Sequence, residues 1–117
     1  DLNIVGRDDR TNGRRASLKT LMGKVDPSKY TILLDHQPYH LEEAQRAGVD
    51  FQLSGHTHYG QVWPISWIED AMYEDAYGPL TKGNTRYYVT SGIGIWGGKF
   101  RIGTRSEYVV ATISQSF

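Results

Sequence analysis

The chain has 117 residues, which is enough for one modest domain with a hydrophobic core. Its 13 basic and 13 acidic residues give a formal net charge of zero, so bulk electrostatic attraction to nucleic acid or to anionic lipid is not expected. The chain contains no cysteine, which excludes disulfides and thiolate metal sites. Histidine, carboxylate and amide side chains remain as metal ligands, and these suit zinc, manganese or iron.

The first third of the chain predicts a strand, a loop, a short helix and a second strand. Residues 2–5 form an apolar run, and the Gly-, Asn- and Asp-rich residues 6–13 are typical of a loop. Ser17 can cap a helix over 18–22, and the apolar residues 30–34 predict a buried strand. Four arginines of this region are interpreted as solvated loop residues: Arg7, Arg10, Arg14 and Arg15.

A strand–helix–strand unit is expected in the middle of the chain. Residues 40–47 have a helical spacing of apolar side chains and end at Gly48, and residues 51–54 form the next apolar run. This compact order predicts that strands 30–34 and 51–54 are parallel.

The rest of the chain is less regular. Residues 62–80 are interpreted as an excursion with one or two helical turns, and 92–98 as a glycine-rich loop. Strands are expected over 86–91 and 107–114, as an antiparallel pair. Three tryptophans are interpreted as core residues rather than as the wall of a substrate site: Trp63, Trp67 and Trp96.

Histidines follow two of the expected strands. His36 comes directly after strand 30–34, and His56 and His58 come after strand 51–54. The carboxyl ends of parallel strands meet at one sheet edge, where open α/β folds place ligands, so these imidazoles are candidate metal ligands. His40 stands at a helix start and is interpreted as a surface residue.

The motifs around these histidines resemble a known family. Ile32-Leu33-Leu34-Asp35-His36-Gln37-Pro38, followed by Asp50-Phe51-Gln52-Leu53-Ser54-Gly55-His56-Thr57-His58-Tyr59-Gly60-Gln61, is similar to the C-terminal half of the calcineurin-like metallophosphoesterases. The likeness is to the bacterial branch whose last motif reads Gly-His-Thr-His-Gly-Gly-Gln. Tyr59 stands where that motif has glycine.

The resemblance implies a fold and a chemistry. Residues 1–117 would form the second half of a four-layer α/β/β/α sandwich, with a mixed sheet and flanking helices. The activity implied is hydrolysis of a phosphate ester by hydroxide activated between two divalent ions, with Mn, Zn and Fe all open. His36 and His56 would hold one ion and His58 the other. Further candidates, as partners of these rings or as substrate contacts, are Asp35, Gln61 and Tyr59.

The family's Asp-x-His, Gly-Asp and Gly-Asn-His motifs do not occur in this chain. We therefore expect them before residue 1, no catalytic residue among 1–117, and little activity from the chain alone. A bare sheet face would then be covered by the missing half or by self-association. The substrate stays open between a phosphorylated small molecule and a lipid-linked phosphate, and the location between the cytoplasm and membrane association through an upstream segment. The alternative is a non-catalytic metal- or partner-binding module that retains only this half.

Overall fold

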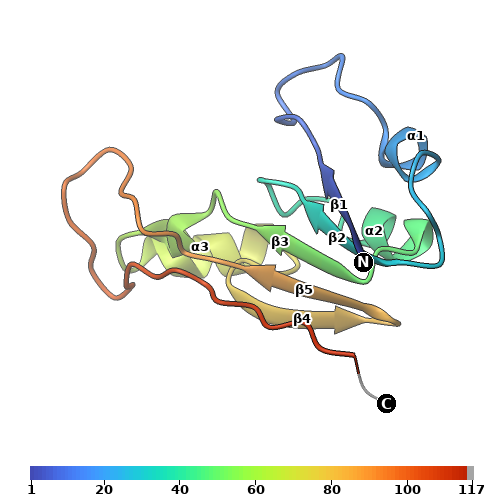
Figure 1. The fold of residues 1–117 in the computed structure, drawn as a ribbon. Helices are drawn as coiled ribbons and strands as arrows, with labels where there is room; N and C mark the ends of the chain where they lie inside the picture. The colour runs from blue at the N-terminus through green and yellow to red at the C-terminus, as the bar shows by residue number, and fades with distance from the viewer. Residues whose placement is uncertain (116–117) are drawn as a thin grey trace.

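The structure is a computed structural model that describes residues 1–115 (Figure 1). Its elements, in chain order, are β1 (Leu2–Gly6), α1 (Leu18–Met22), β2 (Tyr30–Leu34), α2 (Glu42–Ala47), β3 (Phe51–Ser54), the 3₁₀ turn η1 (His58–Gly60), α3 (Ile65–Met72), β4 (Gly78–Lys82) and β5 (Thr85–Val89). The α-helices have five to eight residues, and within 1–115 none combines the length and apolarity of a bilayer-spanning segment.

The strands form one mixed sheet in the order β1-β2-β3-β5-β4. The pairs β1–β2, β2–β3 and β3–β5 are parallel, and β4 is antiparallel to β5. The expected α/β class, the mixed sheet and the parallel pairing of residues 30–34 with 51–54 are therefore confirmed.

One face of the sheet carries the core. Alternate side chains of the strands pack there against α1 and α2, which lie beside β1 and β2 in Figure 1. The buried core residues are Val5, Leu18, Leu33, Leu41, Ala44, Val49 and Tyr87. The other face keeps apolar side chains in contact with solvent, since Leu2, Ile4 and Leu34 are 47%, 67% and 44% exposed.

The predicted antiparallel pair of strands 86–91 and 107–114 is wrong. Strand β5 lies between β3 and β4, so both of its hydrogen-bonding edges are occupied. Within the described part of the chain, residues 107–115 form no strand, and the backbone N–H of Glu107 donates to the Gly92 carbonyl at 2.9 Å. The true partner, β4, begins in residues 62–80, the segment interpreted as an excursion, and its Pro79 is tolerated because β4 is an edge strand.

The interpretation of the tryptophans as core residues is also wrong. Trp63, Trp67 and Trp96 are 53%, 65% and 78% exposed. Trp63 and Trp67 contact each other edge to face, with ring centroids 5.5 Å apart, at the start of α3. The core forms around α1 and α2, and these three residues lie outside it.

Tyr87 offers a test of this core. Its buried hydroxyl donates to the Leu41 carbonyl, which precedes α2. Tyr87→Phe leaves that carbonyl without this partner and is expected to lower the free energy of unfolding by about 1–3 kcal/mol, measured by urea denaturation. Tyr108→Phe is the matched control, because Tyr108 is 82% exposed and the same change should leave stability unaltered. Equal effects of the two variants would contradict the packing described.

Asp75, between α3 and β4, predicts a pH dependence of stability. The residue is 8% exposed, and burial raises the pKa of its carboxyl group to about 6. The folded chain thus keeps this proton to a higher pH than the unfolded chain, so the free energy of unfolding should fall as pH rises from about 4 to above 6. Asp75→Asn should remove that fall and raise stability at pH 8 by about 1–3 kcal/mol in urea denaturation. Asp1→Asn, on a side chain 85% exposed, should do neither.

Candidate functional site

Two of the histidines meet where β2 and β3 end. The backbone N–H of Gly55, just after β3, donates to the His36 carbonyl, just after β2, at 2.9 Å. This bond continues the parallel ladder past the strands and brings the side chains of His36 and His56 together. Their ring centroids are 5.2 Å apart and the rings are nearly perpendicular, at 80°. Both residues are exposed, so a ligand can reach them.

The backbone from His56 to Gln61 is tightly folded. His56, His58, Tyr59 and Gln61 have φ of 70°, 50°, 48° and 51°, in the left-handed region that residues other than glycine rarely adopt. Such strain persists where the surroundings enforce it, often at functional sites. Here the buried Thr57 supplies one restraint, because its hydroxyl donates to the Ala76 carbonyl at 2.8 Å.

Gly60 supplies a second restraint on this turn. A Cβ at Gly60 would lie 2.4 Å from the backbone nitrogen of Ser66, in the first turn of α3. Only glycine allows this approach, and its φ of 67° favours glycine as well. The histidine turn and α3 are consequently packed backbone to backbone.

His58 completes the cluster. It lines two cavities together with His36 and His56, one of about 520 Å³ over the carboxyl ends of the strands and one of about 470 Å³ towards α3. The larger cavity is also lined by Thr90, Ser91 and Gly92, which follow β5. The structure thus brings all three histidines of the sequence motifs to one edge of the sheet.

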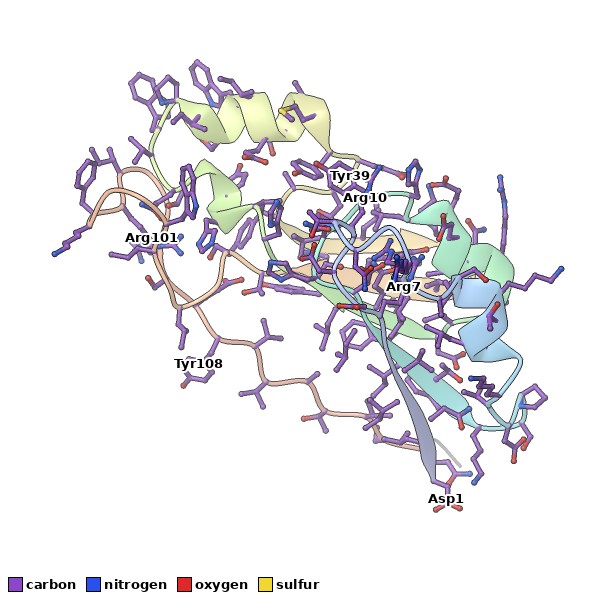
Figure 2. The ribbon with its side chains drawn as sticks, turned by 90° about the horizontal axis from the view of Figure 1, so that it is seen from above. Asp1, Arg7, Arg10, Tyr39, Arg101 and Tyr108 are labelled. Carbon is purple, nitrogen blue, oxygen red and sulfur yellow. The ribbon has the colours of Figure 1, made fainter. Side chains whose placement is uncertain are left out.

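Arg101 ties His58 to the glycine-rich loop. Its guanidinium group donates to the carbonyls of His58 at 3.1 Å, Ser91 at 2.8 Å and Gly94 at 2.6 Å, and Nη2 lies 3.5 Å from Nδ1 of His58. Figure 2 shows Arg101 beside the orange loop that follows β5. Arg101 was not among the expected site residues, and no spacing could have revealed this role, because its partners lie up to 43 positions away.

The other candidate residues contact groups outside the histidine rings. The buried Asp35 accepts from Nη1 of Arg7 at 3.1 Å and Nη1 of Arg15 at 3.3 Å. These two arginines therefore take part in a buried ion cluster, although the sequence analysis interpreted them as solvated. Arg10, labelled in Figure 2, lies with its guanidinium carbon 4.1 Å from the centre of the Tyr39 ring.

The side chains of Tyr59 and Gln61 contact neighbouring segments of the chain. The Tyr59 ring stacks on Tyr77 with centroids 4.9 Å apart, and its hydroxyl donates to Asp70 at 3.3 Å. The buried Gln61 side chain bonds to the backbone of the glycine-rich loop at Trp96. In the described part of the chain, neither residue hydrogen-bonds to a histidine ring.

The histidine pair has the chemistry of part of a metal site. Partial burial lowers the pKa of His56, and the neighbouring His36 lowers it further. Both effects favour the neutral imidazole, which is the form that binds a metal. Among residues 1–115, however, no three His, Cys, Asp or Glu side chains are grouped so as to hold one metal ion. The residues therefore fit an incomplete centre.

One carboxylate near the pair, that of Asp9, was not among the expected metal ligands. Hydrogen bonds from Thr11 lower the pKa of Asp9, and nearby His36 and His56 lower it further. Asp9 lies in the loop after β1, which is parallel to β2, so that loop begins at the same sheet edge as the histidines. Ligands in open α/β folds bind at the carboxyl ends of the strands, which is how the histidines were identified. The same reasoning could have indicated this loop.

Comparison with known proteins gives relatives of one kind. The chain is 41% identical over 86 residues to an uncharacterized metallophosphoesterase of Helicobacter pylori strain J99, a match that covers 72% of the chain and 23% of that protein. It is 38% identical over 93 residues to an uncharacterized metallophosphoesterase of Campylobacter jejuni, covering 77% and 25%. A third, from Aquifex aeolicus, is 32% identical over 118 residues, covering 94% and 44%. No family model and no solved structure matches the chain.

The chain spans about a quarter of the length of the Helicobacter and Campylobacter relatives, and the match lies in their C-terminal part. The part of this chain that matches them carries the paired histidines at the strand ends. On this similarity, the chain belongs to the metallophosphoesterase family.

Proposed function

We propose that the chain supplies the histidine side of a divalent-metal centre that hydrolyses a phosphate ester. The observation that carries this proposal is the meeting of His36 and His56, 5.2 Å apart at the ends of two parallel strands. The family membership supports it, because the relatives are named metallophosphoesterases.

In this proposal, His36 and His56 hold one ion and His58 holds the other. Bound divalent ions would polarise the phosphoryl oxygens and lower the pKa of a water molecule. Manganese, zinc and iron all accept such nitrogen ligands. Neutral imidazoles cannot bridge two cations, so the centre needs carboxylate ligands in addition to the three histidines.

The chain's own contribution is orientation. The bond from Gly55 to His36 aligns the backbone segments that carry two of the imidazoles, and Arg101 fixes the backbone of His58 against the loop after β5. Asp35 is held by two arginines beneath this edge and keeps β2 and the loop after β1 together. These restraints hold the ligand positions before a metal or substrate arrives.

We further propose that the chain forms the second half of a four-layer α/β/β/α sandwich. The apolar face with Leu2, Ile4 and Leu34 is the surface that a second sheet would cover. The short match to much longer relatives supports a covering layer supplied by other residues of the same protein, with a second copy of the chain as the other possible source.

A non-catalytic metal- or partner-binding module is the second candidate. It is favoured by one observation, the lack within residues 1–115 of any three-residue group that could hold a metal ion. Such a module would bind a cation or a partner without turnover. The two candidates make different predictions for hydrolysis.

Metal titration tests the role of the histidines. In calorimetry with Mn²⁺ or Zn²⁺, His56→Ala should weaken binding to the chain at least about tenfold, a loss seen even when an outer partner of a ligand is removed. His40→Ala is the matched control, since this exposed histidine stands before α2 and lines neither histidine cavity. Equal losses in the two variants, with circular dichroism showing both folded, would contradict the assignment.

Hydrolysis of bis(p-nitrophenyl) phosphate tests the activity. Expressed within the full reading frame of its gene, the protein should hydrolyse this diester with Mn²⁺ and lose the activity with EDTA. His56→Ala should lower kcat/KM at least about a hundredfold, because it removes part of the metal's stabilisation of the transition state. The 117-residue chain alone should be nearly inactive. Hydrolysis by neither form, with metal bound, would favour the binding module.

A further inference from the structure

One wall of the cavity beside the histidines is apolar. The cavity of about 470 Å³ has His36, His56 and His58 on its polar side. Its lining also includes Ile65, from the start of α3, and Trp96, from the glycine-rich loop. These two side chains are 46% and 78% exposed, so they meet solvent next to a set of imidazoles.

The position of Trp96 is fixed through its backbone. The side chain of Gln61, which is 6% exposed, donates from Nε2 to the Trp96 carbonyl at 2.8 Å and accepts from the Trp96 N–H at 2.5 Å. The same Nε2 also donates to the Gly98 carbonyl at 2.8 Å. A buried amide with this many partners holds its loop firmly, because breaking the bonds would leave buried polar groups unpaired.

Packing of the hydrophobic core does not account for the position of the exposed Trp96 indole. The hydrophobic core lies on the other side of the molecule, around α1 and α2, and does not include Trp96. The neighbouring Ile93, Ile95 and Phe100 are also exposed, at 72%, 49% and 57%. Gln61, only three residues after His58, thus holds an apolar loop against the histidine cavity.

We propose that this wall binds the apolar part of the substrate, so that the substrate is an amphiphilic phosphate ester. Its phosphate would lie at the histidines and its alkyl or aryl group against Trp96 and Ile65. This inference rests on the proposed phosphoesterase function and narrows its substrate class. The continuity of the polar floor and the apolar wall within one cavity is what supports it.

The charges around the cavity are compatible with such a ligand. Arg101 lies beside His58 and brings positive charge to the phosphate end. Glu69 also lines the cavity, and partial burial raises the pKa of its carboxyl group. Apart from the histidines, Glu69 is the one residue with an ionisable side chain among those that line this cavity.

Binding of a homologous series tests the inference. Methyl, butyl and hexyl phosphate would be titrated by calorimetry into the Mn²⁺-loaded protein, expressed within its full reading frame. Because each methylene that leaves water favours binding, Kd should fall about twofold to fourfold per methylene. Trp96→Ala should flatten this dependence while changing the Kd of methyl phosphate less than twofold, and Trp96→Phe should restore most of it.

Trp67→Ala is the matched control, because Trp67 is 65% exposed and does not line the cavity. It should keep the wild-type dependence on chain length. If methyl phosphate binds in a metal-dependent way and hexyl phosphate binds no more tightly, this inference is overturned and the phosphoesterase proposal stands. The same result is expected if a second copy or another segment covers the wall. An unchanged slope in Trp96→Ala would overturn the role of Trp96. No metal-dependent binding of any member would overturn the phosphoesterase proposal and this inference with it.

Discussion

The parallel alignment of β2 with β3 is the constraint on which the site depends. The register places Leu34 beside Leu53, and a further backbone bond, from Gly55 to the His36 carbonyl, lies beyond the last paired residues. A shift of one residue would turn alternate side chains to the opposite face and separate the two imidazoles. The register is in turn set by the core, because Thr31, Leu33, Gln52 and Ser54 must all point to the buried side.

The sequence predicts those features that depend on residues close together in the chain, and it fails for those that depend on residues far apart in it. The strand–helix–strand unit and its terminal histidines depend on patterns within about thirty residues, and the structure has them where they were expected. The pairing of β5 depends on competition between strands for its edges. Residues 107–114 have the composition of a strand, but β4 already occupies the edge that they would need.

The surroundings of the histidines were predictable only in part for the same reason. Arg101 and Trp96 reach the histidine turn from 35 to 43 positions away, through bonds to backbone carbonyls and to the Gln61 amide that any loop could offer. No residue pattern specifies such contacts. The tryptophans were misread because a large apolar side chain usually packs in a core, whereas these three lie on a surface that the sequence does not distinguish from the interior.

Gly60 links the chemistry of the turn to the motion of a helix. Since its Cα lies against the backbone of Ser66 without room for a methyl group, the backbone of the histidine turn is in direct contact with the first turn of α3. A displacement of the turn towards α3, as by a bound ion, would be passed directly to Ile65 and its neighbours on α3. The apolar wall would then respond to occupancy of the histidines by rigid contact, without an intervening side chain.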